Sequence, residues 1–181
     1  CSKILPITQE VQSSLLRRNI IQRNKTHVIS LGVNPNRFVP VNNKSKIKEY
    51  FGIKKGNLVV TMACRFDETK DYLTFLKIAK DIIEYTPNVQ FLVVGDTKKN
   101  LEASDTSAIK IKNDLDSFIM QNPRLKNYVI FTGFQEDMVP VYHATDILFS
   151  CSHLETLPMS FLEAASCGLP LIALENTSTA R

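Results

Sequence analysis

The sequence has few cysteines, and their arrangement excludes two common uses of that residue. Four cysteines stand at positions 1, 64, 151 and 167, with no Cys-x-x-Cys pair and no cluster of histidines beside them. This spacing argues against a zinc site and against the disulfide framework of small secreted domains. We therefore expect buried free thiols in a reducing compartment.

Long apolar runs and clustered basic residues are also absent. No stretch approaches the length of a membrane-spanning helix, and the first residues lack the basic region and apolar core of a signal peptide. The net charge of +4 suits an anionic ligand but is too diffuse to indicate nucleic-acid binding. These absences predict a cytoplasmic protein with no nucleic-acid partner.

Two ligand motifs are missing as well. No Gly-x-Gly-x-x-Gly follows any apolar run, which argues against binding of a nicotinamide dinucleotide. The one Asp-x-Asp pair, Asp114 and Asp116, lies within the helix expected at 109–121 and is not a metal motif at a strand end. Nothing in the sequence therefore calls for a divalent metal, and no cofactor is expected.

The order of apolar segments predicts the fold class. The 181 residues, 44% of them hydrophobic, suffice for one domain with a proper core. Buried β-runs are expected at 58–66, 89–95, 128–133, 146–152 and 169–174, with helices at 70–85, 109–121 and 138–144 between them. This alternation indicates an α/β fold, a Rossmann-like parallel sheet with helices on both faces. Ligands of such sheets bind at the carboxyl ends of the strands, near a switch in strand order.

The remaining segments are expected to be shorter or irregular. A helix should begin near Thr8 and run to about Ile20, and a short one should span 45–51. A β-run is expected after Thr26, followed by turns at Gly32 and at Pro35, and an irregular surface loop at 96–107.

The stretch from Cys151 to Ala173 carries the strongest indication of function. It predicts a strand exit, a loop holding Glu155, and a helix with Thr156 as N-cap and Pro158 in its first turn. The helix is apolar on nearly every side, which predicts that it is buried, and Glu163 in its middle therefore needs a partner or a role. Its N-terminal N–H groups favour an anion in the same loop.

Glu155, seven intervening residues, Glu163 and the following Ala-Ala-Ser-Cys-Gly-Leu-Pro-Leu-Ile-Ala resemble a known signature. It is the E-x7-E signature of retaining, nucleotide-sugar-dependent glycosyltransferases of family 4, which have the GT-B fold. The resemblance covers roughly residues 29–173. It implies transfer of a hexose-type sugar from a nucleoside diphosphate sugar, UDP- or GDP-linked, to a hydroxyl acceptor. A structural helix whose Glu163 pairs with a core Lys or Arg is the alternative interpretation.

The resemblance also implies the cations of the site. Arg65 and Lys70 match the family's Arg after the first strand and its Lys just before the next helix. An arginine fork and a lysine point charge can hold a diphosphate and stabilise the charge that develops on it. Glu155, Arg65 and Lys70 are therefore the expected catalytic residues. Alternatively, the two cations are surface charges balanced by nearby acidic residues, namely Asp67, Glu68 and Asp71.

Further donor contacts are implied around these residues. Glu163 would accept the ribose hydroxyls, and the loop and helix start would contact the phosphate or sugar through Leu157, Pro158, Met159 and Ser160. Leu157 stands where the family more often has a Gly- or Phe-containing loop. Phe134 and Gln135 follow the third strand, where the family contacts the base mainly through main-chain groups, so the base is not identified.

The resemblance predicts a domain division. Residues 1–26 would be a remnant of the N-terminal acceptor domain, and 27–181 the donor domain, incomplete at its C-terminus. The pattern of the crossover is partly kept, since Leu31 replaces the customary Asn and Asn34 the customary Asp. The isolated chain should therefore bind a donor but be inactive. A saccharide or lipid-linked acceptor, as in polysaccharide or lipopolysaccharide biosynthesis, would bind the missing domain, and contact of the full-length protein with the inner membrane surface is left open.

Other function classes fit less well. A sugar-nucleotide epimerase of the same fold would need more acid and base groups at its strand ends, and a phosphorylase would need a lysine for pyridoxal phosphate. A non-catalytic nucleotide-binding module would have no need for Arg65, Lys70, Glu155 and Glu163 together.

Overall fold

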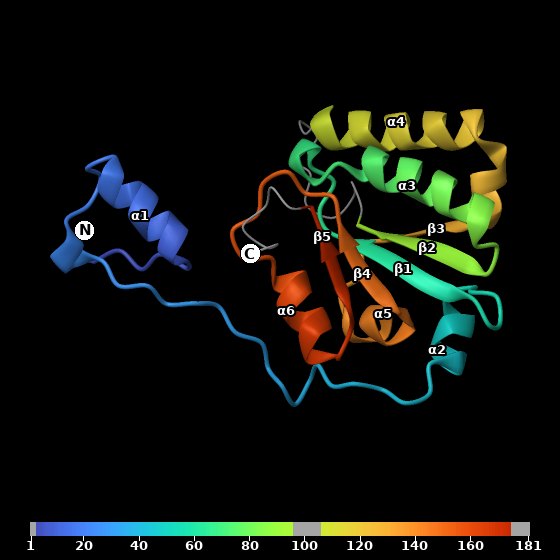
Figure 1. Cartoon of the computed structure of the whole chain (residues 1–181), viewed down its shortest axis with the longest axis horizontal. Coiled ribbons are helices and arrows are strands. Elements are labelled where there is room, and N and C mark those ends of the chain that lie inside the picture. The colour runs from blue at the N-terminus through green and yellow to red at the C-terminus, as the bar shows by residue number, and fades with distance from the viewer. Residues whose placement is uncertain (1–2, 96–105, 175–181) are drawn as a thin grey trace.

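Five parallel strands form one sheet in the computed structural model, which describes residues 3–95 and 106–174 (Figure 1). Their order across the sheet is β3-β2-β1-β4-β5, and each neighbouring pair is parallel. The strands are β1 (Leu58–Ala63), β2 (Val89–Val94), β3 (Val129–Gly133), β4 (Ile147–Ser150) and β5 (Leu171–Ala173).

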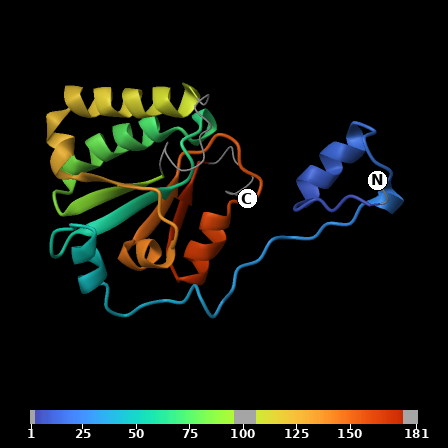
Figure 2. The ribbon, with the colours of Figure 1, turned by 180° about the vertical axis from the view of Figure 1, so that it is seen from behind.

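Helices cover both faces of the sheet. One face carries α3 (Tyr72–Tyr85) and α4 (Thr106–Gln121). The other carries α2 (Ser45–Tyr50), α5 (Val139–Ala144) and α6 (Met159–Ser166), as Figures 1 and 2 show from opposite sides. Because a strand followed by a helix returns to a parallel neighbour, α3, α4, α5 and α6 are the crossovers of the sheet, whereas α2 precedes its first strand. The predicted α/β class, with helices on both faces, is confirmed.

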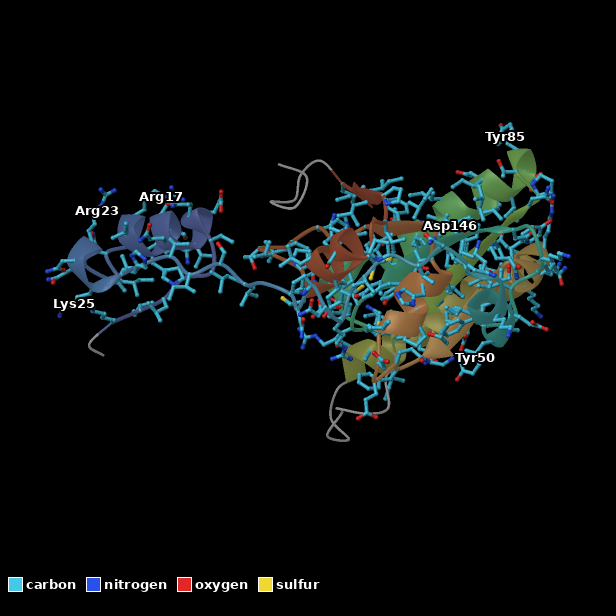
Figure 3. The ribbon with its side chains drawn as sticks, turned by 90° about the horizontal axis from the view of Figure 1, so that it is seen from below. Arg17, Arg23, Lys25, Tyr50, Tyr85 and Asp146 are labelled. Carbon is cyan, nitrogen blue, oxygen red and sulfur yellow. The ribbon has the colours of Figure 1, made fainter. Side chains whose placement is uncertain are left out.

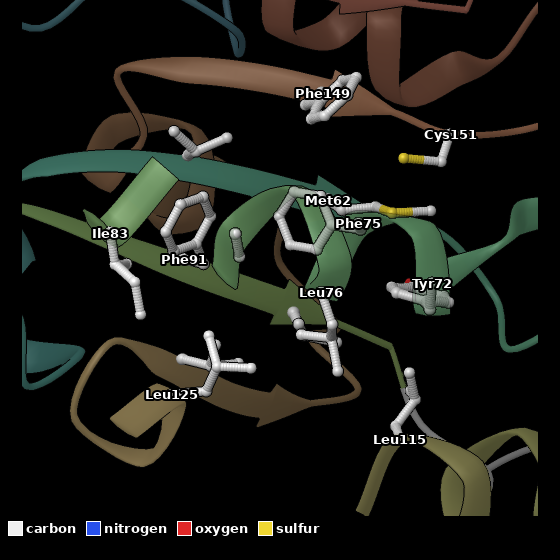
Figure 4. Close-up of a cluster of buried hydrophobic side chains, with 14 of the residues drawn as sticks. Met62, Tyr72, Phe75, Leu76, Ile83, Phe91, Leu115, Leu125, Phe149 and Cys151 are labelled. Carbon is white, nitrogen blue, oxygen red and sulfur yellow. The ribbon is translucent and has the colours of Figure 1, made fainter. Parts of the chain in front are cut away.

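The larger core lies between the sheet and α3 (Figure 4). Phe75 of α3 is its centre, with ring centroids 5.8 Å from those of both Phe91 on β2 and Phe149 on β4. Leu76 and Ile83 repeat along the same face of the helix at helical spacing and are buried. The apolar face predicted for the helix at 70–85 thus packs α3 against β1, β2 and β4.

A second core packs α5 and α6 against the other face. It contains Phe38, from the chain segment that leads into the domain, together with Tyr142, Leu148 and Phe161. The Ser166 hydroxyl donates to the Phe38 carbonyl oxygen at 2.6 Å. The entering segment is therefore fixed to the end of α6.

The N-terminal segment stands to one side of the sheet (Figure 3). Its helix α1 (Gln9–Arg17) begins as predicted, because the Thr8 side chain caps it by accepting from the Val11 N–H. It ends at Arg17, before the expected Ile20, and Asn19 takes a left-handed φ of 52°. A short 3₁₀ helix (Arg23–Lys25) follows.

The β-run expected after Thr26 is wrong as a sheet strand. Thr26 forms one parallel bridge with Ile4, and the N–H groups of His27 and Ile29 donate to the carbonyl oxygens of Ile4 and Pro6, but no strand forms directly after Thr26. Ile29 is 52% exposed there. Among the described residues, the run pairs only with the short segment at residues 4–6, so its β-propensity is not realised as a strand of the sheet.

Several element boundaries also differ from the prediction. β1 ends at Ala63 and β4 at Ser150, because the chains beyond them turn away to form loops. The N-cap of α6 is Pro158, so Thr156 is not the cap. Of the loop expected at 96–107, residues 96–105 lie outside the described residues, and Thr106 and Ser107 begin α4.

Two short 3₁₀ helices complete the domain, at Glu68–Lys70 before α3 and at Pro123–Asn127 before β3. No helix in the described ranges is both long and apolar enough to span a bilayer.

Candidate active site

The strand order reverses direction between β1 and β4. From β1 the chain adds β2 and then β3 on one side, whereas β4 and β5 lie on the other. At such a switch point the connections leave in opposite directions and open a crevice at the carboxyl ends of the two strands. The loop after β1 carries Arg65 and Lys70, and the loop after β4 carries Glu155.

Lys70 and Glu155 form an ion pair at this point. The Lys70 ammonium lies 2.5 Å from Glu155 Oε1, and each side chain is only 14% exposed. The Ser152 hydroxyl donates to the same oxygen at 3.0 Å and accepts in turn from the Ser150 hydroxyl. Ser152 is completely buried. The carboxylate of Glu155 is thus held between a cation from one loop and a hydroxyl from its own.

A small pocket of about 10 Å³ lies beside this carboxylate. It is bounded by the ends of β1 and β4, by Glu155 and by the start of α6, where Ser160 and Phe161 contribute. This volume admits about one water molecule. A larger ligand entering this pocket would have to displace or rearrange the ion pair.

Arg65 stands on the same loop as Lys70, five residues before it. It is exposed, and among the described residues no carboxylate or carbonyl oxygen accepts a hydrogen bond from it. The nearby Glu68 instead lies 3.9 Å from Lys110, and Asp67 caps its own turn through Thr69. Lys70 thus pairs with Glu155 of the other loop, while the charges of Lys70 and Arg65 also contribute to lowering the pKa of Asp67, after its hydrogen bonds from Thr69.

The start of α6 presents unused donors. The N–H groups of Leu157, Met159 and Ser160 donate to no acceptor within residues 3–95 and 106–174, and Pro158 has no N–H. The first-turn donors of a helix have no partner inside it, so they are available to an anion. The predicted contact residues at 157–160 thus stand at a helix end beside Glu155.

The expectation that α6 is buried all round is wrong. Phe161 and Ala164 are its buried residues, whereas Met159 is 38% exposed. The helix packs one face against the sheet, and small or flexible apolar residues occupy its other side. The apolar composition of the helix did not distinguish burial on all sides from burial of one face.

Glu163 has a neutral partner. The Tyr142 hydroxyl of α5 donates to Glu163 Oε2 at 2.6 Å, and no described Lys or Arg forms an ion pair with this carboxylate. The structural alternative, a core cation paired with Glu163, is therefore wrong for the described residues. Burial and this hydrogen bond raise the pKa of Tyr142 well above its ordinary value. Sequence reasoning missed Tyr142.

Phe134 and Gln135 follow β3, at the same edge of the sheet but farther along it. β2 lies between β3 and β1, so roughly 10 Å of strand spacing separates β3 from β1. Gln135 folds back so that its side-chain amide donates to the Thr132 carbonyl oxygen at 2.9 Å, and Phe134 is 45% exposed. These residues therefore flank the crevice and do not belong to its ion pair.

Tyr72 and Gly95 fix the floor beneath Arg65. The buried Tyr72 hydroxyl contacts the carbonyl oxygens of Cys64 and Val94 at 2.6 and 2.9 Å, and accepts from the Cys64 N–H. At Gly95 a Cβ would stand 2.3 Å from the Cys64 oxygen. The ends of β1 and β2 are clamped closer together than any residue with a side chain would allow.

His153 ties the two loops together a second time. Its ring Nε2 lies 2.8 Å from Asp71 Oδ2, and the backbone N–H of His153 donates to the Thr69 carbonyl oxygen at 2.8 Å. Burial raises the pKa of Asp71, but hydrogen bonds from Thr74 and His153 outweigh it and hold that pKa below its ordinary value. His153 thus links the loop after β4 to the start of α3.

The cysteines and acidic residues show no metal chemistry among the described residues. No three His, Cys, Asp or Glu side chains gather there as a metal site. Cys64, Cys151 and Cys167 are free thiols, and burial raises the pKa of Cys64 and of Cys151 to about 12. These two thiols stay protonated near neutral pH.

A doubly wound parallel sheet with cations and a helix N-terminus at its switch point is the architecture of a nucleotide-binding domain. The family model described as "Glycosyl transferases group 1" matches residues 43–181, and the chain belongs to this family.

Comparison with individual proteins agrees with that family. A curated relative from Escherichia coli, UDP-Gal:alpha-D-GlcNAc-diphosphoundecaprenol alpha-1,3-galactosyltransferase, is 29% identical over 174 residues, which are 94% of this chain and 42% of the relative. Mannosylfructose-phosphate synthase of Agrobacterium fabrum is 26% identical over 95% of this chain and 37% of its own length. The chain thus spans less than half the length of these relatives.

Solved structures share the fold. The structure of Anabaena Alr3699/HepE in complex with UDP and glucose has a TM-score of 0.84 at 22% identity, and the match covers 99% of this chain and 46% of that one. The C-terminal domain of a glycosyl transferase group 1 family protein from Francisella tularensis has a TM-score of 0.66 at 26% identity, covering 80% of this chain and 71% of that domain.

Proposed function

We propose that this chain is the donor-binding portion of a retaining glycosyltransferase of family 4. It would bind a nucleoside diphosphate hexose, and the whole protein would transfer the sugar to a hydroxyl acceptor. The observation that carries the proposal is the switch-point crevice, where Arg65, the Lys70–Glu155 pair and the start of α6 meet. The name of the Escherichia coli relative and the UDP and glucose of the Anabaena structure support a donor of this class.

The diphosphate would take the place beside Lys70. Arg65 is exposed and forms no close ion pair among the described residues, and the N–H groups of Leu157, Met159 and Ser160 stand at the same end of the sheet. A diphosphate near these groups competes with Glu155 for the Lys70 ammonium. Its binding would free the carboxylate to contact the sugar, which is the role proposed for Glu155.

The nucleoside would extend along the carboxyl edge of the sheet. Glu163 would accept the ribose hydroxyls, since a carboxylate has two oxygens suited to a vicinal diol. Phe134 and Gln135, two strands away, would flank the base, with main-chain groups making the specific contacts.

The chemistry would proceed on one face of the sugar. The acceptor oxygen would bond to the anomeric carbon as the bond to the phosphate oxygen breaks, and the leaving phosphate would take the acceptor's proton. Arg65, Lys70 and the α6 N–H groups would stabilise the charge that develops on the diphosphate. No protein nucleophile and no metal are needed for this sequence of events.

Residues outside this chain would supply the acceptor site. We propose that residues 1–26 belong with the acceptor domain and that residues from 27 onward form the donor domain. The acceptor would be a saccharide or a lipid-linked saccharide, and the whole protein would act in the cytoplasm or at the inner membrane surface. The chain alone would then bind nucleotide and show little or no transfer.

Calorimetric titration with UDP, GDP and ADP and with their hexose conjugates tests the proposal. One nucleotide should bind with a Kd below about 1 mM, equivalent to roughly −4 kcal/mol. Arg65→Ala should weaken it at least tenfold, whereas Lys77→Ala, which removes an exposed lysine of α3, should not. A folded chain that binds none of these ligands, or equal effects of the two substitutions, would contradict the proposal.

A further inference from the structure

A hydrogen bond from Tyr142 joins α5 to the carboxylate of Glu163 on α6. The Tyr142 hydroxyl donates to Glu163 Oε2 at 2.6 Å, and the tyrosine is 1% exposed. The two residues stand 21 positions apart on different helices. No sequence pattern joins them, and the bond is formed only because the two helices lie on the same face of the sheet.

The bond determines which oxygen of Glu163 is available. A tyrosine hydroxyl has one proton to donate, and here that proton is directed to Oε2. A neutral donor leaves the carboxylate its negative charge and leaves Oε1 as an acceptor. A lysine or arginine in the same place would neutralise the charge and compete with a ligand's hydroxyls for both oxygens.

The position of the hydroxyl is itself fixed by packing. The Tyr142 ring lies edge-on to Phe38, with ring centroids 5.9 Å apart, and belongs to the core that holds Leu148 and Phe161. Phe38 is fastened to the end of α6 by the bond from Ser166. Packing against these residues therefore holds the Tyr142 ring in the core with its hydroxyl at Glu163.

We infer that Tyr142 is a positioning residue, which orients Glu163 for the vicinal hydroxyls of a nucleotide ribose. The inference rests on the proposed function, because it assigns to Glu163 the ribose of the donor. Tyr142 itself would not touch the ligand. It would act by restricting the carboxylate to one orientation, which lowers the entropy lost when the diol binds.

Comparing ligands with and without the ribose hydroxyls shows whether Tyr142 positions Glu163 or only stabilises the fold. Tyr142→Phe keeps the ring in the core and removes only the hydroxyl. The chain and this variant are titrated with UDP and with 2′,3′-dideoxyuridine diphosphate, and with the GDP pair if UDP does not bind. Tyr85→Phe, which removes a hydroxyl from an exposed ring, is the matched control. Circular dichroism and thermal unfolding show whether each variant is folded.

The unaltered chain should bind the ribose form about tenfold more tightly than the dideoxy form. Tyr142→Phe should lose about five- to tenfold in affinity for the ribose form and almost none for the dideoxy form, so that the preference disappears. Tyr85→Phe should behave as the unaltered chain.

Two results would overturn the inference while leaving the proposed function intact. One is an equal loss for both ligands in Tyr142→Phe, which indicates a general structural effect. The other is an unchanged ribose preference. If the unaltered, folded chain bound neither diphosphate pair, the proposed function itself would fail, and the role of Tyr142 with it.

Discussion

Lys70 and Glu155 form an ion pair across the switch point, so replacing either residue should lower the free energy of unfolding. Both side chains are 14% exposed, and an unpaired charge at such a position loses water without gaining a partner. We predict that Lys70→Met lowers the free energy of unfolding by roughly 3 kcal/mol. Urea denaturation followed by circular dichroism measures this change.

The double variant tests whether the loss comes from the Glu155 carboxylate keeping its charge after its lysine is removed. Lys70→Met with Glu155→Gln should be more stable than Lys70→Met alone, because no buried charge remains. Lys77→Met changes an exposed lysine on α3 and should have little effect. A loss in Lys70→Met no larger than in this control would show that the ion pair contributes nothing.

Asp146 is a second charged centre, at the opposite ends of the same strands. It lies 3.1 Å from Lys44 and 2.5 Å from Lys48, and its Oδ2 accepts from the Val59 N–H. Burial raises its pKa, but the hydrogen bonds from Lys48, Val59 and Lys44 outweigh that effect and hold the pKa below its ordinary value. Figure 3 places Asp146 within the domain, away from the N-terminal segment.

The sign of the pH dependence follows from that direction. Because the folded-state pKa is depressed, the stabilisation is complete above the unfolded-state pKa of about 3.9 and is lost as the pH falls through the folded-state pKa. Asp146→Asn should therefore be clearly less stable than the unaltered chain at pH 7. The difference should shrink between about pH 5 and pH 2.

Urea midpoints at a series of pH values measure this difference. Asp81→Asn, on the exposed side of α3, controls for the loss of one carboxylate. A gap between Asp146→Asn and the unaltered chain that stayed constant down to pH 2 would rule out ionisation of Asp146 as its source.

At the scale of elements, the ends of β1 and β2 depend on the absence of a side chain at Gly95. A Cβ there would lie 2.3 Å from the Cys64 carbonyl oxygen and 3.1 Å from the Tyr72 hydroxyl, at a φ of +148°. Gly95→Ala must therefore push β1 and β2 apart or break the Tyr72 clamp, and we predict a loss of about 3 kcal/mol or more.

Gly52 provides the matched comparison. It also has a positive φ, +72°, but nothing lies within 4 Å of its Cβ position. Gly52→Ala should therefore cost only about 1 kcal/mol, the usual penalty of a left-handed conformation. Equal losses in the two variants, measured by thermal unfolding, would show that close approach at Gly95 has no consequence.

The sheet could be predicted from sequence because its strands are apolar and lie between punctuating residues. β2 shows this best, since all six of its residues are buried. The β-run after Thr26 has the composition of a strand, but among the described residues it pairs only with the short segment at residues 4–6, outside the sheet. Propensity reports what a segment could form, whereas pairing depends on the rest of the chain.

The site could be predicted only incompletely. The sequence placed Arg65, Lys70 and Glu155 at strand ends, and the structure brings Lys70 and Glu155 together. The sequence could not show which charged residues form ion pairs, because Lys70 and Glu155 are 85 positions apart and Asp146 is 98 positions from Lys48. Tyr142 gave no signal, since a tyrosine in a short apolar helix is indistinguishable from a core residue.

At the scale of the whole molecule, two concave regions at opposite ends of β1 compete as ligand sites. One is the switch-point crevice. The other is a groove of about 820 Å³ beside α2, lined by residues between Asn42 and Leu58, including Lys44, Lys48 and Lys55. The groove is far larger, but it lies at the amino ends of the strands, where ligands of such sheets are not bound. Volume therefore favours the groove beside α2 as the ligand site, whereas topology favours the switch-point crevice.

Amide chemical shifts of the isotopically labelled chain, recorded during titration with UDP and then GDP, decide between them. The largest changes should fall on Arg65, on Lys70, on Glu163 and on the N–H groups of Leu157, Met159 and Ser160. Residues 42–58 should change little. Changes concentrated in 42–58, with the start of α6 unaffected, would contradict a donor site at the switch point.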